Sequence, residues 1–315
     1  MTHEKAKKAR LFSTDSQVLT VLNGDITGKL FVWPEGPLQI NELGDAIFNE
    51  AREVPYHTHT TGCETFVLLK GGVEIHVNHK KAIISKGDLM HIRSHVHHGF
   101  RILEPGSEWR EMFQEMDMYG GIQKKDTLRT YSPELLEDPV FNAERTLRSG
   151  TSYGETPPLR EVAKGDIPEI KAADRPFSTT QTPLGDFHLR VPRWELDGVK
   201  EIWQFDLVPG ASLAYQLPFD SAPMYHVLSG SLHVETDAEA FEAAQGDLVY
   251  IPHYLRHTLT VGAEGVSLLA LNVQSRLGLI FEQLGAVPSD DWDTIQAVLR
   301  QHNCWLTACT PYFTV

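Results

Sequence analysis

The chain has 315 residues, of which 41% are hydrophobic and 22% are charged. This composition is that of a globular protein with one large domain or two ordinary ones, and it excludes collagen, coiled coils and disordered chains. A formal net charge of −14 disfavours binding to the phosphate backbone of nucleic acids.

The N-terminal residues are charged, and no apolar run reaches the roughly 18 residues of a membrane span. We therefore expect neither a secretory signal nor contact with a membrane. The three cysteines, an odd and sparse set, exclude a disulfide scaffold and fit a reducing compartment. The expected location is the cytoplasm.

Short runs rich in Val, Ile, Phe and Tyr, broken by Gly, Pro and Asp, predict antiparallel strands in two stretches of the chain. These runs span 18–22, 29–33, 65–69, 73–77 and 82–92 in the first stretch, and 187–191, 201–208, 224–230, 231–235 and 246–252 in the second. The segment between the stretches is polar, with one short helix predicted over 132–150. Acidic residues followed by a late arginine predict another helix within 289–303.

The two β-rich stretches are copies of one unit. A constant offset along the chain superposes, without a gap, Gly71 on Gly230, Gly87 on Gly246, Asp88 on Asp247, Ile92 on Ile251 and His98 on His257. A repeated β domain explains this register. The expected organisation is an N-terminal domain over 1–120, a connector over 121–180, a C-terminal domain over 181–285 and a helical segment over 286–315.

The first copy carries a set of metal-ligating residue types. His57 and His59 are two residues apart on a predicted strand, so their side chains point the same way. Glu64 begins the next strand, and a histidine from the cluster over 95–98 completes three imidazoles and a carboxylate. This set suits Fe(II), Mn(II), Ni(II), Co(II) or Zn(II), and the sequence does not choose among them. A His-x-His pair alone is more often two surface histidines.

The second copy has lost these residues. Gln216, Pro218 and Pro223 stand at the positions of the two histidines and the glutamate, and only His257 remains. One imidazole and one amide make a poor transition-metal site, so we expect the second domain to be free of metal.

The histidines, the glutamate and the glycines of the first copy resemble the two motifs of the cupin superfamily. The first motif, G-x5-HxH-x3,4-E-x6-G, is matched by His57, His59, Glu64 and Gly71, with Ala51 at the leading glycine. The second motif, G-x5-P-x-G-x2-H-x3-N, is matched by Gly87 and His98, with Arg93, His95 and Ile102 replacing the usual Pro, Gly and Asn. The resemblance implies an all-β fold of two tandem jelly-roll barrels. The fourth ligand is His98 or its neighbour His97, with the repeat favouring His98.

The sequence also indicates which residues would line a substrate pocket around the expected metal. Phe66 and Leu68 are in phase with Glu64 on its strand, and Phe100 would share the inward face of the following strand. Together they would form an apolar pocket suited to an aromatic substrate, or they are simply barrel core. Arg93 would bind a carboxylate or enolate at the mouth, or form a surface salt bridge.

Among bicupins, the chain looks most like oxygenases of the quercetin 2,3-dioxygenase type. That resemblance implies one divalent transition metal per chain, Fe(II) first with Ni, Co, Mn or Zn as alternatives. It also implies O2 and an enolic, phenolic or polyketide-like aromatic substrate whose C–C bond is cleaved. Glu64 would be both ligand and proton acceptor. Because related bicupins are often dimers, and because exposed edge strands need to be covered, we also expect a homodimer.

Two other function classes stay open. The same metal site can act as a Lewis acid in an isomerase, lyase or hydrolase. The chain can also be a bicupin that binds a ligand without converting it. Turnover that needs O2 distinguishes the oxygenase from both.

Overall fold

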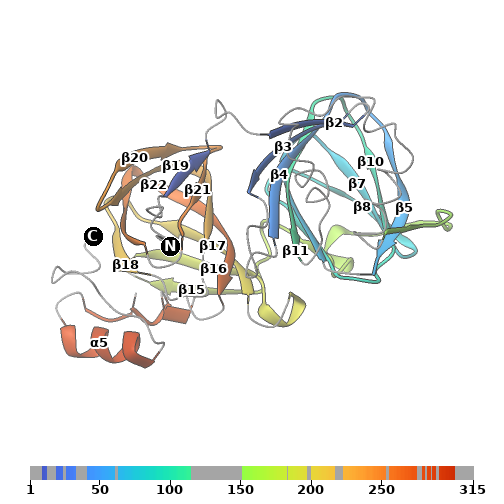
Figure 1. Ribbon diagram of the computed structural model, residues 1–315. Coiled ribbons are helices and arrows are strands. Elements are labelled where there is room, and N and C mark those ends of the chain that lie inside the picture. Colours follow the sequence, from blue (N-terminus) through green and yellow to red (C-terminus); the bar gives the residue numbers. More distant parts are fainter. Residues whose placement is uncertain are drawn as a thin grey trace, which may run out of the picture. The chain divides into compact units, whose positions relative to one another are not determined.

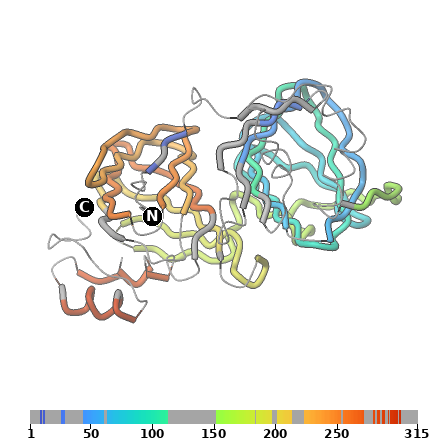
Figure 2. Tube along the Cα trace, viewed as in Figure 1, coloured from blue at the N-terminus to red at the C-terminus, as the bar shows by residue number. Residues whose placement is uncertain are grey.

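The structure, a computed structural model, forms two compact units (Figure 1; Figure 2). One unit is Gln17–Arg175, and the other combines Met1–Ser16 with Pro176–Val315. The residues described are 9–12, 19–23, 26–32, 41–60, 63–114, 151–182, 184–196, 200–216, 223–252, 255–274, 279–280, 282–284, 286–288 and 291–301.

In the Gln17–Arg175 unit, here called the first barrel, the described strands form two sheets. One sheet has the order β12 (Thr151–Tyr153), β5 (Glu53–His59), β10 (His98–Ile102), β7 (Val73–Val77), β8 (Lys80–Ile84), β13 (Arg160–Glu161). The other has the order β14 (Ile170–Lys171), β9 (Leu89–Ile92), β6 (Cys63–Lys70), β11 (Ser107–Gln114), β4 (Asn41–Phe48), β3 (Ile26–Val32), β2 (Leu19–Asn23). A short 3-10 turn, η1 (Lys164–Asp166), precedes β14. Buried side chains from both sheets, among them Phe66, Ile75 and Trp109, form one core.

In the other unit, the second barrel, the described strands form one sheet. Its order is β1 (Arg10–Phe12), β21 (Leu248–Tyr250), β19 (Met224–Thr236), β22 (Arg256–Gln274), β17 (Lys200–Leu207), β16 (Gly185–Val191), β15 (Ser178–Thr182). Off this path, β18 (Ser212–Gln216) pairs with β22 and β20 (Ala240–Ala244) pairs with β19, while η2 (Arg193–Glu195) follows β16. Phe187, Trp203, Phe205 and Tyr225 are central to its core. The mostly-β architecture predicted from the sequence is confirmed.

The C-terminal helix is confirmed as α5 (Trp292–Gln301). The Thr294 N–H donates to Asp291 Oδ1 over 3.1 Å, which caps the helix N-terminus. Ile295 is fully buried in the core of the second barrel. The helix predicted over 132–150 lies outside the described residues. None of the described helices is long and apolar enough to cross a membrane.

The internal repeat reappears in backbone hydrogen bonds. In the first barrel the Leu68 N–H donates to Asp88 O over 3.0 Å, and in the second the Val227 N–H donates to Asp247 O over 3.0 Å. Both contacts fasten the turn that carries the shared Gly-Asp-Leu sequence. The two copies therefore share local geometry as well as residues.

Strand pairing crosses the domain boundaries that we expected. The N-terminal strand β1 pairs with β21 of the second barrel. The strands β12, β13 and β14, which lie in the expected connector, add to the sheets of the first barrel through β5, β8 and β9. These short polar segments cover sheet edges that would otherwise expose unpaired backbone groups.

Gly71 allows a turn that other residues cannot adopt without strain. Its φ is +82°, and a Cβ there would lie 2.3 Å from Ser107 Oγ and 2.9 Å from Ser107 Cα. We expect Gly71→Ala to lower the free energy of unfolding by about 2–4 kcal/mol, from left-handed strain and overpacking together. Gly210, with φ +75° and nothing within 4 Å of an added Cβ, is the matched control. Gly210→Ala should lower the free energy of unfolding, measured with urea, by only about 1–2 kcal/mol. Equal losses would contradict this account.

Candidate metal centre

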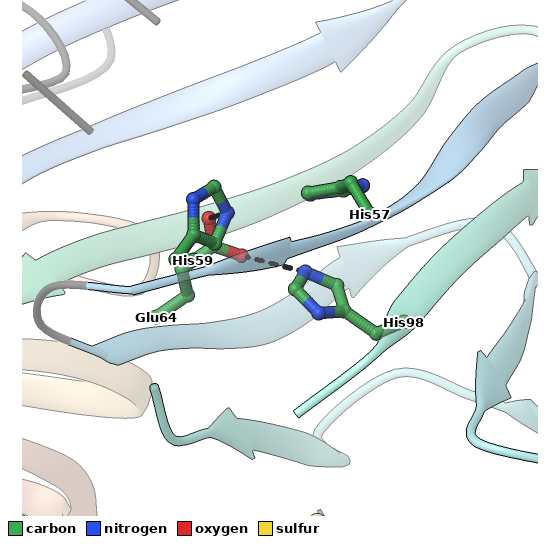
Figure 3. Close-up of side chains that lie close together, drawn as sticks. All are labelled: His57, His59, Glu64 and His98. Carbon is green, nitrogen blue, oxygen red and sulfur yellow. Dashed lines mark ion pairs between the residues drawn. The ribbon is translucent and has the colours of Figure 1, made fainter. Parts of the chain in front are cut away.

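The structure brings four predicted side chains together in the first barrel (Figure 3). His57 and His59 lie at the end of β5, Glu64 lies on β6, and His98 begins β10. Strands β5 and β10 are hydrogen-bonded neighbours, with His98 opposite His57. One ligand atom from each of the four residues lies within 4.8 Å of all the others, and all four residues are buried.

Backbone carbonyls fix the tautomers of two of the imidazoles. His57 Nδ1 lies 2.6 Å from Pro55 O, and His98 Nδ1 lies 2.9 Å from Val96 O. A carbonyl can only accept, so each Nδ1 carries a proton, and Nε2 is the ring nitrogen left to face the cluster. Metal-bound histidines are held in this way, with the remote ring nitrogen donating to a fixed acceptor.

Glu64 provides the negative charge of the cluster. Its Oε1 lies 2.5 Å from His59 Nε2, and its Oε2 lies 3.4 Å from His98 Nε2. Burial raises the pKa of Glu64, but His59 and His98 outweigh burial and hold that pKa well below its usual range. Burial, with a smaller contribution from His98, lowers the pKa of His57 to about 4. At neutral pH the cluster thus offers a carboxylate and a neutral His57, which are the protonation states that bind metals.

The donor set fits a divalent transition metal. Ligands about 2.1 Å from a common ion are at most about 4.2 Å apart, so small side-chain movements suffice to close the observed cluster around one. Three imidazoles with one carboxylate suit Mn(II), Fe(II), Co(II), Ni(II) or Zn(II). In the part of the chain that the structure describes, no other group of three or more His, Cys, Asp or Glu could hold a metal.

The structure distinguishes the two candidate histidines of the second motif. His98 is fully buried and points into the cluster. The exposed His97 instead stacks on Tyr56, with ring centroids 5.9 Å apart. His95, at the usual glycine position, has a φ of +66°, and its N–H donates to His59 O over 2.6 Å. This left-handed conformation explains why glycine suits that position.

The four residues of the predicted substrate pocket are not equally close to the cluster. Phe100 borders it, with its ring centroid 5.5 Å from that of His98. Phe66 packs on Phe100 at 5.6 Å, and it is buried in the barrel core together with Leu68. Arg93 is exposed in the turn between β9 and β10. Among these residues, Phe100 makes ring contacts with the ligands His57 and His98.

Sequence reasoning missed one aromatic neighbour of the cluster. Tyr153 on β12 lies opposite His57 across the strand pair, with ring centroids 5.7 Å apart. It belongs to the segment expected to be a connector, where no hydrophobic periodicity marked a strand. Only the structure could reveal this pairing.

In the second barrel, His257 keeps the geometry of its repeat counterpart His98. Its Nδ1 lies 2.8 Å from Leu255 O, as His98 Nδ1 does from Val96 O. Burial lowers the pKa of His257 to about 4. The position that corresponds to Glu64 is occupied by Pro223, which has no carboxylate.

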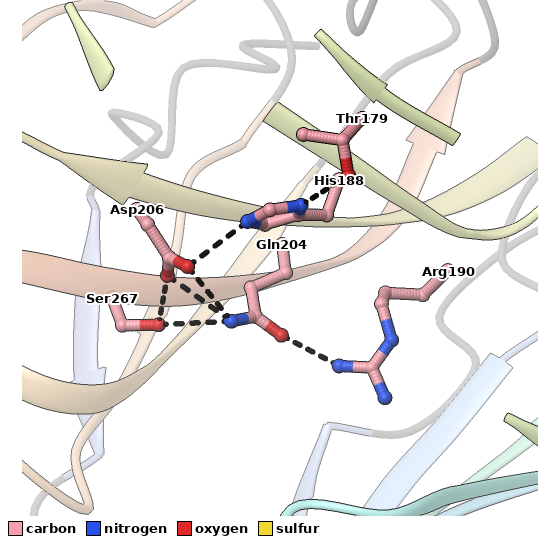
Figure 4. A network of polar contacts seen from close by, with 6 residues as sticks. All are labelled: Thr179, His188, Arg190, Gln204, Asp206 and Ser267. Carbon is pink, nitrogen blue, oxygen red and sulfur yellow. Dashed lines mark hydrogen bonds and ion pairs between the residues drawn. The ribbon is translucent and has the colours of Figure 1, made fainter. Parts of the chain in front are cut away.

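A polar network joins four strands of the second barrel, β15, β16, β17 and β22 (Figure 4). Asp206 accepts from Ser267 Oγ over 2.5 Å and pairs with His188 Nε2 at 3.1 Å. The other members are Thr179, Gln204 and Arg190, whose Nη1 donates to Gln204 Oε1. These side chains alternate with the core residues of their strands, so the network lies on the sheet face opposite the core. Its contacts are those of a structural cross-link between strands.

Residues 44–107 match the family model of the cupin domain. The formate complex of oxalate decarboxylase from Lactobacillus farciminis is similar over 91% of this chain and 95% of its own, with a TM-score of 0.55 and 14% identity. The chain thus has a bicupin fold, with a cupin-domain match in its first barrel. Oxalate decarboxylase from Bacillus subtilis at pH 4.6 is similar over 96% of this chain and 87% of its own, with a TM-score of 0.51 and 15% identity.

Another similar structure, from work on the Mn(II) centres of Bacillus subtilis oxalate decarboxylase, has a TM-score of 0.50 and 16% identity. It aligns with 92% of this chain and 83% of its own. At these identities the likeness shows a shared fold. No curated protein matches the chain.

Proposed function

We propose that this bicupin is a metal-dependent dioxygenase that cleaves a C–C bond of an enolic or phenolic aromatic small molecule with O2. The buried cluster of His57, His59, Glu64 and His98 carries the proposal. Bound there, a divalent metal such as Fe(II) or Mn(II) would act as a Lewis acid and support reaction with O2. Both oxygen atoms of O2 would enter the product as the C–C bond breaks.

The chain's own residues would prepare the substrate for this reaction. Glu64 is ionised, and its Oε2 can accept the proton of an enol or phenol hydroxyl as the substrate binds as an anion. The carbonyls of Pro55 and Val96 hold His57 and His98 in fixed orientations. The Phe100 ring beside His98 adds an apolar surface, which excludes water and strengthens electrostatic contacts nearby.

A second candidate is a non-redox or decarboxylating reaction on a small carboxylate, since several structures with this fold are oxalate decarboxylases. The surroundings of the cluster favour the aromatic substrate. A dicarboxylate carries two negative charges, so beside the metal it calls for a further cation near Glu64. Arg93, the cation considered from the sequence, is exposed, whereas aromatic rings of Phe100 and Tyr153 lie beside the cluster.

Oxygen consumption tests the proposal. The protein, loaded with Fe(II) or Mn(II), is given a panel of enols, catechols and polyphenols, with oxalate alongside, in air and under strict anaerobiosis. We expect O2 uptake equimolar with loss of an aromatic substrate, and both atoms of labelled O2 in the product. Glu64→Gln should lose most of this turnover. Equal anaerobic turnover, or conversion of oxalate to formate and CO2 alone, would contradict the proposal and support the second candidate.

A further inference from the structure

Tyr153 lies beside the metal-ligand cluster because β12 pairs with β5. The antiparallel register sets Tyr153 opposite His57, so both side chains lie on the same face of the sheet. That face carries His57 toward the other ligands. The Gly154 N–H donates to Tyr56 O over 2.9 Å, which continues the pairing past Tyr153 and holds its backbone in place.

The Tyr153 ring is open to solvent, although the cluster beside it is not. Tyr153 is 63% exposed, whereas His57 is 7% exposed and His98 is fully buried. The Tyr153 and His57 rings are tilted by 44° at a centroid distance of 5.7 Å. One side of the tyrosine therefore contacts a ligand of the cluster, and much of its remaining surface faces solvent. The other aromatic neighbour, Phe100, is 2% exposed and packed into the core.

We propose that Tyr153 is a stacking platform that selects planar aromatic substrates over small carboxylates at the metal centre. This inference rests on the proposed function and names the residue that would determine its specificity. A planar ligand that reaches the cluster on the side of Tyr153 would lie against the exposed surface of this ring. Such aromatic contacts, with the area they bury, change an affinity by about tenfold. A small dianion such as oxalate has no ring to stack and gains little from the platform.

Ligand binding without turnover tests the platform. The Co(II)-loaded protein is titrated anaerobically with 4-nitrocatechol, followed by its visible absorption, and oxalate affinity is measured by competition. We expect Tyr153→Ala to weaken nitrocatechol binding about tenfold and to change oxalate binding less than about twofold. Tyr153→Phe, which keeps the ring, should bind both probes as the native protein does. Phe177→Ala, at an aromatic residue that is 58% exposed in the second barrel, is the control for loss of any surface ring.

Three results would overturn the platform alone. The first is unchanged nitrocatechol binding in Tyr153→Ala. The second is an equal loss of affinity for nitrocatechol and oxalate, and the third is loss of Co(II) from the variant. The last two would make Tyr153 a positioning residue for His57. Native Co(II)-loaded protein that binds neither probe would overturn the proposed function, and the platform with it.

Discussion

Replacing His98 with alanine is expected to abolish metal binding, whereas replacing His257 should leave it intact. The two residues occupy the same position in the repeat, both are buried, and both hold Nδ1 on a backbone carbonyl. Only His98 lies in a cluster with two other histidines and a carboxylate. Loss of outer residues that orient a ligand typically costs about 10–100-fold in metal affinity, so loss of a ligand itself should cost at least about 100-fold.

Chelator competition with Co(II) or Mn(II) measures both affinities. His257→Ala also reports what removal of a buried imidazole does to the fold, because it leaves a similar cavity in the other barrel. Circular dichroism of each variant checks that both barrels stay folded. Equal losses of metal affinity in the two variants, or none in His98→Ala, would contradict the assignment of the site.

Asp45→Ala is expected to destabilise the first barrel by about 3–5 kcal/mol. Asp45 forms a two-pronged ion pair with Arg110, through Nε to Oδ1 at 2.6 Å and Nη2 to Oδ2 at 2.9 Å. Both side chains are almost fully buried. Truncating the aspartate removes both charged hydrogen bonds from a buried guanidinium, and removing one partner of a buried ion pair is strongly destabilising. Urea unfolding of the first barrel measures the change.

The pair of Asp237 and Arg256 in the second barrel is the matched control. It has a similar N–O distance of 2.6 Å, but its side chains are 66% and 52% exposed. Asp237→Ala should therefore change the free energy of unfolding by at most about 1 kcal/mol. A comparable loss in both variants would show that burial does not decide the cost.

The candidate site could be assembled from sequence because its information is local. The two-residue alternation of a strand puts His57 and His59 on one face, and the repeat aligns His98 with His257. The structure then separated His98 from the exposed His97, which spacing alone could not do. The glycine positions of the repeat were likewise readable, since a turn with positive φ demands them.

The remaining features depend on pairing between distant segments. The strand β1 joins the barrel at the other end of the sequence, and β12 covers β5 from a polar stretch without periodicity. Edge strands of two or three residues carry too little hydrophobic pattern to be recognised. Tyr153 was missed for this reason, because its proximity to His57 follows only from that register.

Metal content is the most direct test of the central claim that the first barrel holds one divalent metal. Untagged protein is analysed by elemental mass spectrometry, after reconstitution if needed, beside His57→Ala. The account predicts about one equivalent of a transition metal per chain in the native protein and almost none in the variant. No bound metal in either protein, or the same content in both, would contradict it.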